Sequence, residues 1–103
     1  MFGMLAKLTA HPGKGDELAT LLLEGADSLR SNDECLLYVV SRPADDPDGV
    51  WVTEAWRTED AHKASLEREE VRAVIARAGP LLAGSPEAIR VEPIGGKGLP
   101  DGG

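Results

Sequence analysis

Apolar residues recur along this chain with two different periods, and glycine and proline residues separate the blocks. In residues 16–30 the apolar positions lie three or four residues apart, which indicates a helix with one apolar side and with Asp16 as a suitable N-cap. The positions that form this side are Leu18, Leu21, Leu22, Ala26 and Leu29. A second helix is expected over residues 59–78, capped by Thr58 and interrupted near residues 67–70.

Short blocks rich in valine, leucine and aromatic residues predict four strands. They cover residues 2–10, 35–42, 50–57 and 87–93. Residues 43–49 form a turn rich in proline and aspartate, so the middle two strands should make a hairpin. The order β-α-β-β-α-β predicts the α+β ferredoxin-like fold, a four-stranded antiparallel sheet with two helices on one face. The domain should span residues 1–93, followed by a flexible glycine-rich tail, 94–103.

The predicted strands are apolar on both faces, although two helices can cover only one. Side chains alternate between the faces of a strand, so Leu37 and Val39 oppose Tyr38, and Trp51 opposes Val52. The uncovered face would be a larger apolar patch than monomers usually expose. Burial alone therefore predicts that this face packs on a second copy of the chain, as a homodimer.

The composition of the chain disfavours several classes of function. The 103 residues suffice for one domain, and 18 acidic against 11 basic residues give a net charge of −7. Such a surface opposes binding to nucleic acid and to anionic membranes. One cysteine and two histidines offer neither an internal disulfide nor zinc-ligand spacing. No apolar run is long enough to span a membrane, and Lys7 interrupts the N-terminal stretch, so a cytoplasmic location is expected.

Three segments of the chain carry a resemblance to a known family. They read LAKLTAHPGKGDEL, ECLLYVVSRPADDPD and TEAWRTEDAH…VRAVIARAGPLLAG, and together they extend over about residues 4–92. They resemble the antibiotic biosynthesis monooxygenase domain, a family of dimeric α+β barrels that includes small quinol monooxygenases. The most specific piece is Glu54-x-Trp56 near the end of a strand, followed by a helix that carries a histidine. The resemblance implies a dimeric barrel with the same element order.

The chain departs from the family pattern at one functional position. Members often have a histidine about nine residues after the tryptophan, on the side of the helix toward the cavity. Ser65 stands there in this sequence, and His62 comes one helical turn earlier. Because residues i and i+3 lie on neighbouring sides of a helix, His62 either serves the same space or points elsewhere.

The resemblance implies oxygenation without a cofactor. An electron-rich phenol, once deprotonated, can pass electrons to O₂ directly, so the protein need only bind a flat ring, accept a proton and exclude water. Trp56 is the candidate for binding the ring, or else a core residue. His62 is the candidate proton acceptor, or else a surface histidine on an exposed helix.

Four further residues complete the candidate site. Glu54 shares the strand face of the tryptophan, so it either faces the cavity or pairs with Arg72 or Arg57. Tyr38 could donate its hydroxyl to a substrate oxygen or belong to the dimer interface. Arg72 could hold an anionic substrate or stay solvated on its helix. Ser65 is a candidate contact with substrate, although no adjacent base supports a nucleophilic role.

The leading hypothesis is a homodimeric, cofactor-independent monooxygenase that oxidises a quinol or polycyclic phenol with O₂. The alternative is a non-catalytic ligand-binding or stress-associated protein on the same barrel, which the serine at position 65 favours. Haem degradation is disfavoured, since relatives of that type carry an asparagine in the first strand. This chain offers Ala6, Lys7 and Thr9 there.

Overall fold

The computed structural model describes residues 1–100, and four strands and three α-helices make up its regular structure. In chain order these are β1 (Phe2–Thr9), α1 (Gly15–Ser28), β2 (Cys35–Ser41), β3 (Gly49–Trp56), α2 (Glu59–Ser65), α3 (Glu69–Ala78), the 3-10 turn η1 (Gly79–Leu81) and β4 (Glu87–Val91). Each strand lies within two residues of its expected limits. The expected second helix forms as two helices, α2 and α3, because the chain breaks helical hydrogen bonding at residues 66–68.

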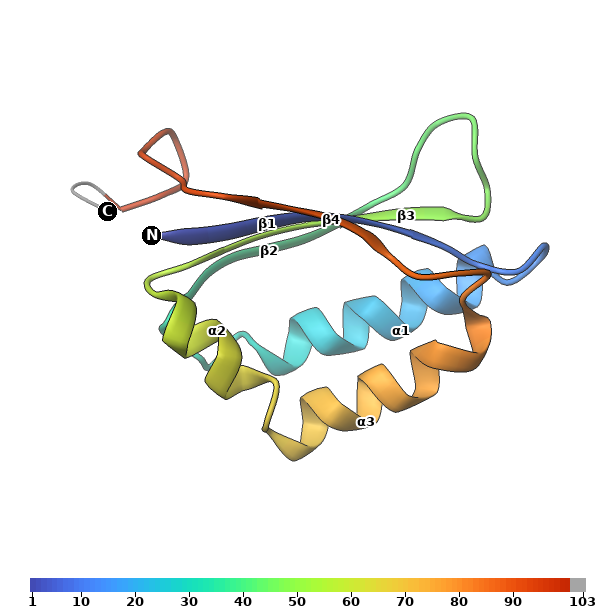
Figure 1. The fold of residues 1–103 in the computed structure, drawn as a ribbon, viewed down its shortest axis with the longest axis horizontal. Coiled ribbons are helices and arrows are strands. Elements are labelled where there is room, and N and C mark those ends of the chain that lie inside the picture. The colour runs from blue at the N-terminus through green and yellow to red at the C-terminus, as the bar shows by residue number, and fades with distance from the viewer. Residues whose placement is uncertain (101–103) are drawn as a thin grey trace.

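The strands form one antiparallel sheet in the order β2-β3-β1-β4. The sheet makes one layer of the molecule, and the helices make the other (Figure 1). This arrangement confirms the predicted ferredoxin-like fold. The register contains one irregularity, a bulge between Cys35 and Leu37 of β2, which leaves Tyr38 opposite Glu54 of β3.

The start of α1 differs from the prediction. Asp16 lies in the first turn of the helix and is not its N-cap; the N-cap position is Lys14, whose side chain makes no capping bond. The carboxylate of Asp48 takes that role, because its Oδ1 accepts hydrogen bonds from the backbone N–H groups of Gly13 (3.1 Å) and Gly15 (3.2 Å). The second helix cap is as predicted, since Thr58 Oγ1 accepts from the N–H group of Ala61 at 3.1 Å.

Helix α1 supplies most of the contact between the two layers. Its predicted apolar side buries Leu18, Leu21 and Leu22 against Val50 and Val52 of β3. Helix α3 packs on α1 and η1, beside α1 in the lower layer (Figure 1). Helix α1 lies against β2 and β3, and α3 makes its main contacts with α1.

The face of the sheet opposite the helices is open, and it exposes several large apolar side chains among polar ones. Trp51 and Ile89 point to this face and are 38% and 61% exposed, and Val39 of β2 is exposed beside them. The prediction that one sheet face would remain uncovered by the helices is therefore confirmed for the single chain.

The segment after β4 forms neither helix nor strand as far as residue 100. The flexible tail expected over 94–103 also includes residues 101–103, which lie outside the described residues. Within residues 1–100 no helix combines the length and the hydrophobicity needed to cross a membrane.

Candidate functional site

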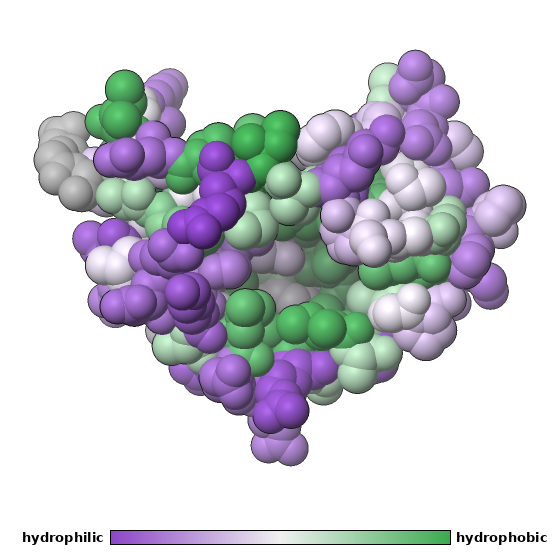
Figure 2. Space-filling model, in the orientation of Figure 1, coloured by the Kyte–Doolittle hydropathy of each residue, from purple (hydrophilic) through white to green (hydrophobic). Residues whose placement is uncertain are grey.

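A cavity of about 250 Å³ lies between the helices and the sheet. It opens in the hollow between the edge of the sheet and α3, where hydrophobic side chains surround the entrance (Figure 2). Every element except β4 and η1 contributes to its wall. The lining residues are Leu8, Leu22, Gly25, Leu29, Tyr38, Glu54, Trp56, His62, Ser65, Leu66, Val71, Val74, Ile75, Ala78, Leu82 and Pro86. Most are apolar, and the four polar ones among them come from β2, β3 and α2.

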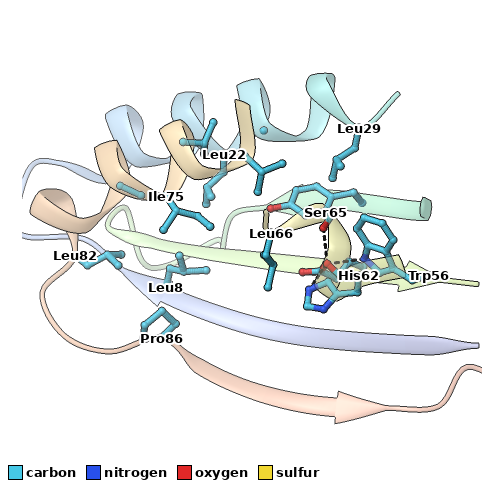
Figure 3. Close-up of a pocket in the computed structure, with 16 residues that line it drawn as sticks. Leu8, Leu22, Leu29, Trp56, His62, Ser65, Leu66, Ile75, Leu82 and Pro86 are labelled. Atoms are coloured by element: carbon cyan, nitrogen blue, oxygen red, sulfur yellow. Dashed lines mark hydrogen bonds and ion pairs between the residues drawn. The ribbon is translucent and has the colours of Figure 1, made fainter. Parts of the chain in front are cut away.

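The cavity has a polar end and an apolar end. In Figure 3, His62, Ser65 and Trp56 gather at one end, whereas Leu8 and Leu82 lie toward the other. This separation would orient a ligand that carries a polar group on an apolar ring, since the polar group can be satisfied only at one end.

Glu54 contacts both Trp56 and His62 at the polar end. Alternation along β3 directs Glu54 and Trp56 to the same side of the sheet, and Trp56 Nε1 donates a hydrogen bond of 2.8 Å to Glu54 Oε1. The same oxygen lies 3.5 Å from His62 Nε2, and the side chains of His62 and Glu54 are only 13% and 12% exposed. The contact is longer than a good hydrogen bond, and it is an ion pair only when the imidazole is protonated.

Aromatic rings hold the imidazole in place. The His62 ring centroid lies 5.0 Å from that of Phe2 and 5.5 Å from that of Trp56, which it meets edge-on. Trp56 itself is 1% exposed. His62 is therefore packed against the end of the cavity, and the alternative of a surface histidine does not fit this structure.

Ser65 is buried beside the histidine. It is 4% exposed, and its hydroxyl donates a hydrogen bond of 2.6 Å to the backbone carbonyl oxygen of His62. This bond closes the last turn of α2, so the hydroxyl hydrogen is already used within the helix. The position that carries the family histidine therefore lines the cavity here with a small side chain.

Burial and charge raise the pKa of two groups near Glu54. The pKa of the Tyr38 phenol lies above its ordinary value of 10.0, mainly because burial disfavours the phenolate and secondly because the Glu54 carboxylate repels it. The pKa of the Cys35 thiol is raised for the same two reasons, with burial the larger. The Tyr38 phenol therefore stays protonated to a higher pH than an ordinary tyrosine does.

The two arginines considered as partners of Glu54 lie elsewhere. Arg72 is exposed and does not line the cavity, so a role in holding substrate there does not fit the structure. Helix α3 turns Val71 and Ile75 to the cavity at i and i+4, which rotates the intervening Arg72 away. Arg57 is directed outward, where its Nε donates to the backbone oxygen of Asp33 at 3.2 Å.

Sequence reasoning missed part of the wall. The apolar side of α3 and the aromatic ring of Phe2 were not singled out, although both contribute to the site. Val71, Val74, Ile75 and Ala78 follow the spacing i, i+3, i+4, i+7, a signal that was present in the sequence. Phe2 had no such signal, because its contact with His62 joins distant parts of the chain.

No group of three or more His, Cys, Asp and Glu side chains within residues 1–100 is arranged to hold a metal ion.

Comparisons with known proteins agree on one family. The antibiotic biosynthesis monooxygenase family model matches residues 1–77. No protein with a curated description matches the chain.

Several solved structures are similar over nearly the whole chain. One, a protein from Chloroflexus aurantiacus provisionally described as an antibiotic biosynthesis monooxygenase, is 40% identical with a TM-score of 0.87, covering 96% of this chain and 98% of that one. A similarly described protein from Caulobacter crescentus is 26% identical with a TM-score of 0.84, covering 91% and 90%. A third, from Deinococcus radiodurans, is 26% identical with a TM-score of 0.79, covering 90% and 92%.

Proposed function

The chain belongs to the antibiotic biosynthesis monooxygenase family, and from this premise we propose that it is a cofactor-independent monooxygenase that oxidises a quinol or phenol with O₂. The observation that carries the proposal is the pairing of His62 with Glu54 at the polar end of an apolar cavity. A general base, a wall of apolar side chains and limited access for water are what this chemistry needs from a protein.

The reaction balances without a further reductant. A quinol and O₂ give a hydroxyquinone and water: one oxygen atom forms the new carbon–oxygen bond, and the other leaves as water. The substrate supplies all the electrons and both hydrogen atoms of that water. The protein therefore acts by taking the phenolic proton and by holding the ring while the electrons pass to O₂.

Each polar residue has a distinct role in this proposal. His62 accepts the phenolic proton, and Glu54, 3.5 Å from Nε2, stabilises the imidazolium that forms. Trp56 forms a rigid wall against which a flat ring can pack. Tyr38 donates a hydrogen bond from its protonated hydroxyl to a substrate oxygen. Ser65 leaves room beside His62.

We propose that the working unit is a homodimer in which the open sheet face covers the same face of a second copy. Members of this family are typically dimeric. The exposed side chains of Val39, Trp51 and Ile89 supply an apolar surface of the kind that pairs with itself across a two-fold axis. A cytoplasmic location stays a prediction.

A non-catalytic ligand-binding protein is the second candidate. It is favoured by Ser65, which replaces the family histidine with a hydroxyl that is engaged with its own helix. Such a protein would bind the same aromatic ligands in the same cavity without consuming O₂.

Oxygen uptake distinguishes the two candidates. The wild-type chain should consume O₂ with naphthohydroquinone faster than spontaneous autoxidation, and His62→Ala should lower the protein-dependent rate by about 10²- to 10⁴-fold, the usual contribution of a general base. His11→Ala is the matched control, because His11 is exposed in the turn before α1 and should leave the rate unchanged. Uptake at the autoxidation rate, or equal loss in both variants, would contradict the proposal.

A further inference from the structure

We propose that the cavity prefers phenols and quinols that carry no negative charge to ring systems that bear a carboxylate or sulfonate. This inference rests on the proposed function for its choice of ligand, but it concerns binding and so can be tested without turnover. It follows from two observations: no lysine or arginine side chain lines the cavity, and the Glu54 carboxylate does.

No cationic side chain reaches the cavity. The chain has 11 lysine and arginine residues, all within the described residues 1–100, and none of them lines the wall. An anionic ligand would therefore exchange its hydration for an apolar surface without gaining an ion pair, which is costly.

Two cations close to the polar end, Arg90 and Lys63, do not line the cavity. Arg90 of β4 binds Glu59 with its Nη2 at 2.6 Å and lies over the Phe2 ring, 5.4 Å from the centroid. Lys63 lies 3.9 Å from the same glutamate. Each lies beside the Glu59 carboxylate and neither lines the cavity, which weakens the positive field that a ligand beside His62 experiences.

The charged groups that do face the cavity are Glu54 and His62. With a neutral imidazole this pair carries one negative charge, and with a protonated imidazole its net charge is zero. In neither state does the polar end become positive. The raised pKa of Tyr38, which Glu54 contributes to, is a second sign that this end disfavours another anion.

Proton transfer from the ligand to His62 does not change the total charge within the cavity. A neutral phenol enters, its hydroxyl hydrogen passes to His62, and the O–H bond is replaced by an N–H bond, so the total charge of the cavity and its ligand does not change. A phenol with an additional carboxylate would place a second negative charge beside Glu54. The cavity of about 250 Å³ falls just below the range of about 300–1,000 Å³ usual for drug-sized ligands, which favours phenols of one or two rings.

The test compares two ligands that differ by one charge. Binding of a naphthol and of a hydroxynaphthoate, with its carboxylate on the ring that bears the hydroxyl, is measured by anaerobic calorimetry at neutral pH. The wild-type chain should bind the naphthol, and the hydroxynaphthoate should bind about 10- to 100-fold more weakly, as expected for one like charge at short range and low dielectric. Equal affinity, or tighter binding of the hydroxynaphthoate, would overturn the inference.

Two variants identify the source of the selectivity. Glu54→Gln keeps an oxygen that can accept from Trp56 but removes the charge, so the preference for the naphthol should fall several-fold. Glu67→Gln changes the net charge equally at an exposed position outside the cavity, and the preference should persist. Loss of preference in Glu67→Gln and not in Glu54→Gln would contradict the assignment.

Failure of this inference is distinct from failure of the proposed function. Selective binding of the naphthol without O₂ uptake from any quinol would support the inference and refute the monooxygenase. Oxidation of quinols together with unselective binding would support the monooxygenase and refute the inference. A chain that binds neither ligand would refute both.

Discussion

A single carboxylate organises the candidate site. Val50 and Val52 are buried on the face of β3 that meets the helices, and alternation along the strand puts Glu54 on the same face. An apolar side chain would be expected at this position. Its Oε1 accepts the Trp56 hydrogen bond and lies beside His62, and its charge contributes to the raised pKa of Tyr38. A carboxylate so far removed from water costs stability, and its proposed role in proton transfer accounts for its presence.

The pKa of Tyr38 can be measured directly because it is the only tyrosine in the chain. We expect the phenolate absorbance of the folded protein to stay absent where a free tyrosine titrates, near its ordinary pKa of 10.0. Since the folded pKa is the higher one, the stability that this group contributes is complete below pH 10.0 and is lost as the pH rises from there through the folded pKa.

Denaturant provides the control for this titration. In urea the single phenol should titrate near its ordinary value, and in Glu54→Gln the folded pKa should move part of the way back. A folded-state titration that coincides with the unfolded one would show that Tyr38 is not enclosed beside Glu54.

At the scale of elements, local patterns predict the helices and strands well and their long-range contacts poorly. Apolar residues at every second position predict β3 and place Glu54 and Trp56 on one face of it. Apolar residues three or four positions apart predict α1. The true cap of α1 was missed because Asp48 comes from a loop far away in sequence. For the same reason the sequence left open whether Glu54 faces the cavity or pairs with an arginine, and folding brings it to the cavity beside His62.

Residues 43–49 pack closely against the start of α1, so adding a single methyl group at Gly15 should lower the stability of the fold. A Cβ atom on Gly15 would lie 1.9 Å from the backbone oxygen of Pro47, so Gly15→Ala must displace the loop or the helix. We expect it to lower the free energy of unfolding by about 1–3 kcal/mol, the usual cost of overpacking. Urea denaturation at fixed protein concentration measures the change.

Gly84→Ala is the matched control. A Cβ atom there meets nothing within 4 Å, and Gly84 does not have a positive φ, so this variant should be neutral or more stable by about 0.4–1 kcal/mol. Equal destabilisation by both alanines would contradict the docking of the loop on α1.

At the scale of the whole molecule, the sheet divides two roles between its faces. The face toward the helices encloses the cavity, and the opposite face exposes Trp51 and Ile89. The alternation of apolar residues on both faces was readable from the sequence. The cavity itself was not, because it arises from how α3 rests on α1, a packing outcome that no local pattern encodes.

The open face predicts the oligomeric state. The wild-type chain should sediment as a dimer, and Val39→Asp should raise the dissociation constant by at least about 100-fold, because an unpaired carboxylate would be buried at the interface. Leu23→Asp is the control, since Leu23 is exposed to a similar extent on α1, away from the sheet. A monomeric wild-type chain, or equal dissociation of both variants, would refute the proposed dimer.

The central claim is that this chain itself inserts an oxygen atom from O₂ into a quinol at the site formed by Glu54, Trp56 and His62. The most direct measurement is mass spectrometry of the product formed from naphthohydroquinone under isotopically labelled O₂. We expect a hydroxyquinone that carries one labelled oxygen atom per molecule, formed by the wild-type chain and by His11→Ala but not by His62→Ala. A product without label, or O₂ recovered as hydrogen peroxide, would contradict it.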